Sequence, residues 1–260
     1  MQEKIWTLLK QLEEEHQIKT IYACEGGSRA WGIESEMSDY DVRFIYVHPT
    51  NYYLSIDPIG TGKKRDVLEG KVHNIELSGW ELTKALRLIR KSNPTLYEWI
   101  YSPIRYFQFY PTINPVRDIL PLAFNPKSCI LHYFNMARKN YSKANKETEV
   151  NIKNLLNIVR PILAMKWIEK YQVFPPVNFQ QLVDEFIIED DIKILIQTLL
   201  NNKRQGNLDE TLQTTVILQF TQNEMSRIES TKASLNVNRI DVTERLNQIF
   251  RETLNELEYK

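Results

Sequence analysis

The stretch GGSRAWGIESEMSDYDVRFIYV, residues 26–47, decides the fold of this protein. It opens with a Gly-Gly-Ser turn, a composition that favours turns for backbone reasons. It closes with residues 40–47, whose β-branched and aromatic side chains are typical of a strand that the following His48-Pro49 pair stops. Residues 19–25, just before the turn, read as a second short, buried strand. Two strands joined through a polar loop are therefore predicted at the centre of the fold.

Two acids, Asp39 and Asp41, stand at the start of the later strand. Because successive side chains of a strand point to opposite faces, both carboxylates are expected on one face. The glycines of the preceding turn would let the backbone approach phosphate oxygens, which its amide groups and the Ser28 hydroxyl would bind. A carboxylate pair facing such a turn is suited to Mg²⁺, which takes a few carboxylates completed by water and phosphate oxygens.

A two-metal site usually needs a third carboxylate. The candidates that follow the strand are Asp66, Glu69, Glu76 and Glu81. The first two fall in a loop rich in Gly and Lys. Ser78 and Glu81 match a capping box that would open a helix at about Gly79. Residues 71–77 are predicted to form a third strand, and Glu76 within it is therefore the predicted third ligand.

Helical spacing appears on both sides of these strands. Apolar residues at Ile5, Leu9 and Leu12 predict an opening helix that ends near His16. Residues 82–89 predict a second helix, and the Asn93-Pro94 pair caps and opens a third. The order of helix, strands and helices describes an α/β (α+β) domain with a small mixed sheet over residues 1–110.

Beyond residue 111 the pattern becomes helical. Long helices are predicted at residues 127–145, 149–171, 178–188 and 191–200, and two more follow towards Lys260. The Pro175-Pro176 pair and residues 201–207 are expected to be connectors. Residues 111–260 are thus predicted to form an α-helical domain that completes the nucleotide and acceptor site.

Charge and cysteine content narrow the function classes. The chain has 33 basic and 33 acidic residues, so its overall charge does not indicate an acidic partner. With only Cys24 and Cys129, a disulfide framework and a zinc site of four thiolate or imidazole ligands are not expected. No stretch approaches the roughly 18 apolar residues of a membrane-spanning helix, and residues 1–17 lack the apolar centre of a signal peptide. A cytoplasmic protein without a membrane partner is expected.

Basic residues gather between residues 111 and 172. Ten Lys and Arg face four acids there; the basic set is Arg117, Lys127, Arg138, Lys139, Lys143, Lys146, Lys153, Arg160, Lys166 and Lys170. Such a block is either a solvated helix face or a nucleic-acid surface. Lys139 and Lys143, with Tyr133, Phe134 and Tyr141 as aromatics suited to stacking on unpaired bases, are the candidate acceptor-binding residues.

Two arginines lie within the deciding stretch. Arg29 and Arg43 are placed either to contact phosphates or to pair with the nearby acids Glu25, Glu34 and Glu36. Surface ion pairs of the second kind are common and weak, and the sequence leaves both readings open.

Residues 26–47 closely resemble the hG[GS]…Dh[DE]h signature, where h is hydrophobic, of polymerase β-type nucleotidyltransferases. Two later runs, IELSGWELTKALRLIRKSNPTLYEWIYSP (75–103) and VRPILAMKWIE (159–169), are similar to a bacterial and phage group of that superfamily associated with RNA repair. The resemblance implies that Gly27 and Ser28 cradle the triphosphate and that Asp39 and Asp41 bind both metals. It also implies that Glu76, where the group usually has Asp, completes the site. The match at 159–169 implies that Arg160, and with it Lys153, reaches the triphosphate.

The resemblance implies attack of an acceptor hydroxyl on the α-phosphate of an NTP, with two Mg²⁺ ions, or Mn²⁺ in their place, and loss of pyrophosphate. The expected acceptor is an RNA or tRNA end, in keeping with the basic region. Two alternatives remain: nucleotidylation, of the AMPylation type, of a protein or small molecule, and a catalytically silent nucleotide-binding or antitoxin-like interaction protein. The intact pair of Asp39 and Asp41 speaks against the silent alternative.

Overall fold

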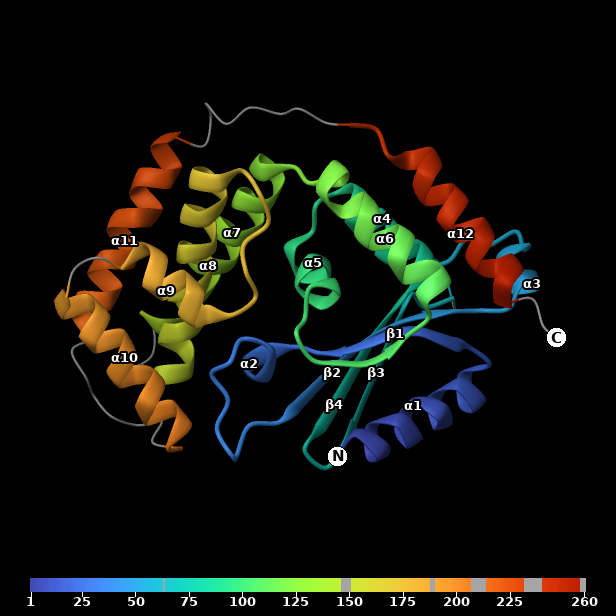
Figure 1. The fold of residues 1–260 in the computed structure, drawn as a ribbon, viewed down its shortest axis with the longest axis horizontal. Coiled ribbons are helices and arrows are strands. Elements are labelled where there is room, and N and C mark those ends of the chain that lie inside the picture. Colours follow the sequence, from blue (N-terminus) through green and yellow to red (C-terminus); the bar gives the residue numbers. More distant parts are fainter. Residues whose placement is uncertain (63, 146–150, 188–189, 207–213, 232–239, 258–260) are drawn as a thin grey trace.

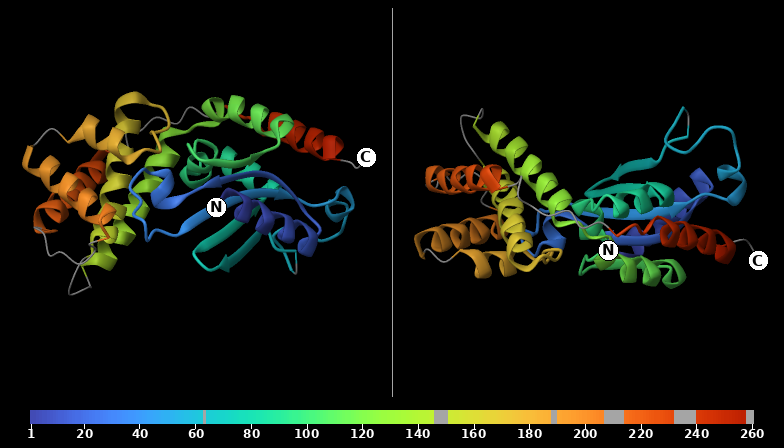
Figure 2. Two further views of the ribbon diagram at one scale, coloured as in Figure 1. Left: turned by 60° about the horizontal axis from the view of Figure 1, so that its bottom comes forward. Right: turned by 90° about the horizontal axis from the view of Figure 1, so that it is seen from above.

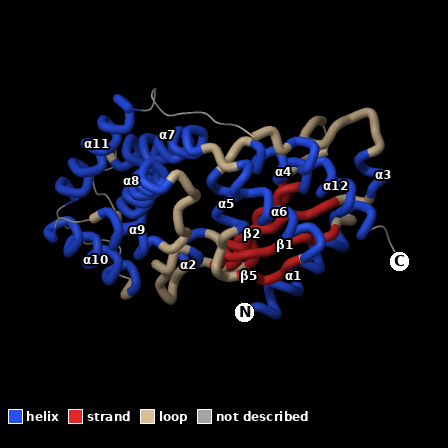
Figure 3. The backbone as a smooth tube through the Cα atoms, turned by 45° about the horizontal axis from the view of Figure 1, so that its top comes forward, coloured by secondary structure: helices blue, strands red, loops and turns tan. Residues whose placement is uncertain are grey.

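The structure is a computed structural model that describes residues 1–62, 64–145, 151–187, 190–206, 214–231 and 240–257. Figure 1 shows a twisted sheet with helices on both faces and, beside it, a separate group of helices. In Figure 3 the strands gather in one part of the molecule while helices α7 to α11 make up the other. The fold is a mixed α+β fold, as the sequence predicted.

One five-stranded sheet runs in the order β3-β4-β2-β1-β5. Its strands are β1 (Lys19–Glu25), β2 (Tyr40–Val47), β3 (Val67–Val72), β4 (Ile75–Glu81) and β5 (Arg105–Gln108). Strands β2 and β4 are parallel and the other pairs are antiparallel, so the sheet is mixed. Strands β1 and β2 have the predicted bounds, and β5 had no counterpart among the predicted elements.

The strand predicted at residues 71–77 is wrong, because this segment turns back on itself. His73 adopts a left-handed conformation (φ 53°) between β3 and β4, which form a hairpin. Histidine is among the residues that tolerate this conformation better than most. Gly79, expected at the start of a helix, lies inside β4, where a Cβ atom would stand 2.2 Å from the Phe44 ring. The strand therefore needs glycine there for packing.

The capping box is also wrong in its detail. Helix α4 (Leu82–Arg90) begins after Glu81, which is itself the N-cap and accepts hydrogen bonds from the amides of Thr83 and Lys84. Its other oxygen accepts the Tyr53 hydroxyl at 2.7 Å. Glu81 is fully buried and serves as a structural centre. The Asn93 cap of α5 (Pro94–Ile100) is confirmed, since its side chain accepts the Leu96 amide.

Helices cover the two faces of the sheet differently. Helix α1 (Gln2–His16), which has the predicted extent, packs Ile5 and Leu9 against Val42 and Phe44 on one face. The opposite face is covered by α4, α5, α6 (Tyr110–Ala123) and α12 (Thr243–Leu257), which share a second core cluster. The views of Figure 2 show these helices and α1 on opposite sides of the strands.

A third core is formed by α7 (Pro126–Ala144), α8 (Ile152–Tyr171), α9 (Phe179–Phe186), α10 (Asp190–Arg204) and α11 (Thr214–Thr231), beside the sheet. Two short helices, α2 (Gly27–Ala30) and α3 (Thr50–Tyr53), lie near the sheet. Helix α10 continues through residues 201–204, which were expected to be a connector. The predicted start of α8 at Glu149 lies outside the described residues. No described helix combines the length and apolar character needed to cross a membrane.

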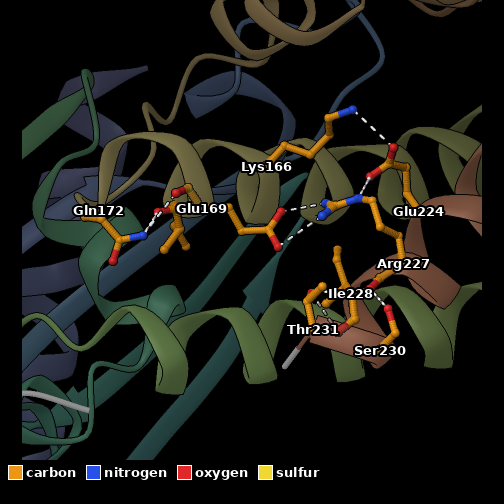
Figure 4. A network of polar contacts seen from close by, with 9 residues as sticks. Lys166, Glu169, Gln172, Glu224, Arg227, Ile228, Ser230 and Thr231 are labelled. Atoms are coloured by element: carbon orange, nitrogen blue, oxygen red, sulfur yellow. Dashed lines mark hydrogen bonds and ion pairs between the residues drawn. The ribbon is translucent and has the colours of Figure 1, made fainter. Parts of the chain in front are cut away.

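Helices α8 and α11 are joined by charged side chains as well as by apolar packing. Arg227 of α11 pairs with Glu169 of α8 at 2.5 Å and with Glu224 at 2.9 Å, and Lys166 reaches Glu224 at 3.2 Å. Figure 4 shows this network along the two helices. These ion pairs link α8 to α11 and involve no residue of the sheet.

The core clusters place α6 and α12 with the sheet. Ile113 and Ile119 of α6 and Leu246 and Ile249 of α12 share the cluster that contains Ile21 of β1. Helices α7 to α11 share another. The division at residue 110 stays a prediction, and we propose on packing grounds that the sheet unit extends to residue 125 and regains residues 243–257.

Candidate active site

The Gly-Gly-Ser turn and Asp41 are held against each other. The Gly26 amide donates to the Asp41 carbonyl at 2.8 Å. Gly27 has φ 55°, and a Cβ atom on it would lie 2.1 Å from an Asp41 carboxylate oxygen. Since no side chain fits in that space, glycine is required where the carboxylate covers the turn. Ser28 follows, half-buried, at the start of α2.

Asp41 is positioned from below by a carboxylate that the sequence analysis did not assign to the site. Glu25 is buried, and its carboxylate accepts the Asp41 amide at 2.6 Å and the Tyr106 hydroxyl. Burial raises the pKa of Glu25, an effect that these hydrogen bonds partly offset. Its position as the last residue of β1, next to the turn, was the available signal.

The parallel pairing of β2 and β4 brings the third acid to the same place. Asp41 and Glu76 are register partners. Lys71 is the register partner of Glu76 across the β3–β4 hairpin. Its ammonium lies 3.1 Å from the Glu76 carboxylate and 3.8 Å from that of Asp39. All three predicted acids therefore lie at the N-terminal ends of the neighbouring strands β2 and β4, close to the Lys71 side chain.

Within the described ranges, no three His, Cys, Asp or Glu side chains are close enough together to hold a metal ion. The acids are paired with cations instead: Lys71 lies between Asp39 and Glu76, and Arg43 contacts Asp41 at 2.6 Å. The ammonium occupies a position between carboxylates, and carboxylate oxygens are the donors Mg²⁺ prefers. The carboxylates are thus of the chemical type that suits Mg²⁺, but as placed they stand too far apart to hold an ion, and binding would require Lys71 to withdraw and the acids to approach one another.

The pKa of Asp41 is shifted by its burial and by charged neighbours of both signs. Burial raises the pKa of the Asp41 carboxyl; the Arg43 guanidinium opposes this shift, and the Glu76 carboxylate adds to it. Smaller effects come from Lys153, which lowers the pKa, and from Asp39, which raises it. Lys153 is exposed at the start of α8, and its effect on the Asp41 pKa places it near the acids.

Residues 1–252 match RlaP, the RNA repair pathway DNA polymerase beta family. The chain belongs to this family. It is 41% identical over 259 residues to the uncharacterized protein YcgL of Bacillus subtilis (strain 168), covering 99% of this chain and 98% of that protein. A crystal structure of a nucleotidyltransferase-like protein from Exiguobacterium sibiricum is similar over 96% of this chain and 79% of its own, at 10% identity and a TM-score of 0.32. The family match confirms the resemblance seen in residues 26–47.

Arg29 and Arg43, the two arginines of residues 26–47, make contacts that differ from both expectations. Arg29 donates to the carbonyls of Ser38 and Asp39 and lies 3.9 Å over the Tyr40 ring. It thus braces the loop that leads to the acids. Arg43 pairs with Asp41 itself. Because Arg43 lies beside Asp41, we propose that it can also bind phosphate.

Arg160 lies deeper than expected. It is 3% exposed, pairs with Glu98 of α5 at 2.8 Å, and stacks 4.3 Å over the Trp31 ring. The predicted reach to the triphosphate does not match this placement, because the guanidinium charge is already neutralised by Glu98. Glu98 was not predicted as a site residue, although an acid flanked by Tyr97 and Trp99 in a short apolar helix indicates a buried partner.

Of the three aromatic residues predicted to bind the acceptor, two are buried and one is half-buried. Tyr133 is fully buried and donates its hydroxyl to Glu98, and Phe134 is also buried, so neither can stack on an RNA base. Both lie on the face of α7 that packs against α8. Tyr141 is half-buried and donates to Gln222. Lys139 and Lys143 are exposed on α7 and stay candidates.

Proposed function

We propose that this protein is a metal-dependent nucleotidyltransferase that transfers a nucleoside monophosphate from an NTP to a hydroxyl acceptor and releases pyrophosphate. The observation that carries the proposal is the approach of the Asp41 carboxylate to Gly27, with Glu76 in register beside it. A phosphate-binding turn and a set of carboxylates at one sheet edge are what phosphoryl chemistry on a nucleotide requires.

In this proposal Asp39, Asp41 and Glu76 hold two Mg²⁺ ions, or Mn²⁺ in their place. When bound, the metal stabilises the attacking and leaving oxygens of the displacement. Gly27 and Ser28 receive the triphosphate through backbone amides and a hydroxyl. Lys153 approaches from α8 and neutralises phosphate charge, while Arg43 and Lys71, once released from the carboxylates, face the same phosphates.

For the acceptor we propose an RNA or tRNA end. The family is described by its place in RNA repair, and α7 exposes Lys139 and Lys143 on the unit beside the active site. Exposed lysines of this kind contribute the electrostatic, sequence-independent part of RNA affinity. Transfer to a protein or to a small hydroxylated compound is the competing outcome of the test below.

The decisive experiment incubates the purified protein and Mg²⁺ with each α-labelled NTP in turn, using total cellular RNA, total protein and a small-molecule extract as separate acceptors. Label in RNA, absent with an Asp41→Asn variant, is the expected result. Label in protein alone would keep the transferase and reject the RNA acceptor. If no fraction or small molecule takes up label, the proposal of a transferase is wrong.

Neutralising Lys139 should weaken RNA binding in a salt-dependent way. Each lysine that contacts the RNA backbone contributes on the order of 0.7 to the slope of log K against log salt for single strands. Lys139→Gln and Lys143→Gln are therefore each expected to reduce the magnitude of that slope by about 0.7, measured by fluorescence anisotropy of a labelled RNA. The matched control is Lys4→Gln on α1, an exposed lysine on the opposite side of the sheet. Equal slopes for all three variants and the unchanged protein would exclude α7 from the RNA surface.

A further inference from the structure

A cavity of about 330 Å³ opens beside Gly27, between the sheet unit and helices α7 and α8. Its walls include Trp31, Glu98, Trp99, Asn140, Asn157 and Arg160. Its volume is within the range of small-ligand pockets. Two tryptophan rings and two uncharged amides belong to its lining, in contrast to the acidic end of β2 and β4 next to it.

The cavity contains ionised groups but little uncompensated charge. Arg160 is paired with Glu98; Arg43, which also lines the cavity, is paired with Asp41 in this structure and is the side chain proposed above to turn to the phosphates. A phosphate entering here would meet a guanidinium whose charge is already balanced, together with the Glu98 carboxylate that balances it. Polyanions are therefore disfavoured relative to a neutral group that forms hydrogen bonds.

One donor in this wall lacks a partner. The Arg160 side chain is almost fully buried, and its Nε finds no hydrogen-bond acceptor in the part of the chain that the structure describes. An unpaired buried donor costs free energy unless something supplies an acceptor. A ligand in the cavity would do so.

An acceptor in the same wall is fixed by a proline. Pro161 has no N–H, so it leaves the Asn157 carbonyl of α8 without its helical hydrogen bond. The Asn140 amide nitrogen donates to that carbonyl at 2.9 Å. Because a carbonyl can only accept, this bond sets the orientation of the amide. The Asn140 oxygen, which accepts no hydrogen bond from the residues that the structure describes, can then serve as an acceptor.

We propose that this cavity binds the base of the incoming nucleotide, an inference that rests on the proposed function. A nucleobase is planar and neutral, and it presents donors and acceptors side by side, which suits aromatic walls with the Asn140 oxygen and the Arg160 Nε. Gly27 borders the cavity, so one nucleotide can place its phosphates on the turn and its base inside. Asn140 and Asn157 are then the residues that favour a nucleoside triphosphate over bare polyphosphate.

The test compares the affinities of two ligands by calorimetry in the presence of Mg²⁺: an NTP analogue with a methylene group between its α- and β-phosphates, and inorganic tripolyphosphate. Asn140→Ala is expected to raise the Kd of the analogue about 3- to 10-fold, the effect of losing one hydrogen bond, and to leave that of tripolyphosphate unchanged. Asn157→Ala, which keeps the carbonyl that Asn140 contacts, should act in the same direction. Asn135→Ala, an exposed asparagine on the same helix, is the control.

The outcomes separate this inference from the function on which it rests. Unchanged analogue affinity in both variants, with both ligands bound by the unchanged protein, overturns the base pocket alone. Equal weakening of the analogue and tripolyphosphate shows a phosphate site and also overturns it. Weaker RNA binding with unchanged analogue binding assigns the cavity to the acceptor instead. If the unchanged protein binds neither ligand, the proposed function is overturned together with the pocket.

Discussion

Replacing Asp41 by asparagine is expected to lower the rate of nucleotidyl transfer by at least about 10²–10³-fold, the range seen when one charge-stabilising group is removed from an active site. Asparagine keeps the shape of the side chain over Gly27 but loses the negative charge that a metal and its bound phosphates need. The fold should persist, because Asp41 is only half-buried and the hydrogen bond from its backbone N–H to the Glu25 carboxylate is unaffected. Initial rates on the acceptor identified by labelling, with a thermal melt for each protein, measure both effects.

Two further variants sharpen this prediction. Asp39→Asn should lower the rate similarly, and the double variant should be no worse than the more damaging single one, since groups that act as a unit are not additive. Glu36→Gln, in the exposed part of the same loop, is the matched control and should be near normal. A folded Asp41→Asn protein that keeps a tenth or more of the rate would remove Asp41 from the catalytic set.

The second large effect concerns stability rather than rate. Replacing Glu81 by alanine is expected to lower the free energy of unfolding by about 2–4 kcal/mol, from the lost helix cap and the buried partners left unsatisfied. The partners are the amides of Thr83 and Lys84 and the hydroxyl of Tyr53. Urea denaturation followed by circular dichroism measures the change.

Glu81→Gln should cost less than alanine, because the amide oxygen still accepts one set of these bonds. Glu69→Ala, an exposed acid on the neighbouring strand, is the comparison and should be within about 0.5 kcal/mol of the unchanged protein. If Glu81→Ala and Glu69→Ala unfold at the same urea concentration, Glu81 has no structural role.

The parts of the fold that follow from local pattern could be predicted from the sequence. Strands β1 and β2, helix α1 and the Asn93 cap each rest on a short run of residues. The β3–β4 hairpin could not, because His73 gives only a weak turn signal and the strand role of Gly79 depends on Phe44, which is distant in the chain. Those contacts exist only after the sheet has formed.

The candidate site divides in the same way. The alternation of β2 predicts that Asp39 and Asp41 share a face, whereas the proximity of Glu76 depends on the parallel register of β4. The burial of Tyr133 and the pairing of Arg160 depend on how α7 and α8 meet α5, since Glu98 lies 62 residues before Arg160. No local spacing contains that information, so the buried Tyr133 was predicted to stack on RNA bases and the paired Arg160 to contact the triphosphate.

Helix α12 has a consequence for how the chain folds during synthesis. Val242, Leu246 and Ile249 complete the core on the α4 and α6 side of the sheet, yet a ribosome makes them more than 100 residues after the rest of that core. The helical group can assemble as soon as α11 has emerged, because its cluster contains no residue of α12. The sheet unit, although translated first, must wait with the apolar face that α4 and α6 present to α12 uncovered until residues 243–257 leave the exit tunnel. The usual vectorial order, in which the earlier unit finishes first, is thereby reversed, and a stalled, incomplete chain would present that face to chaperones and proteases.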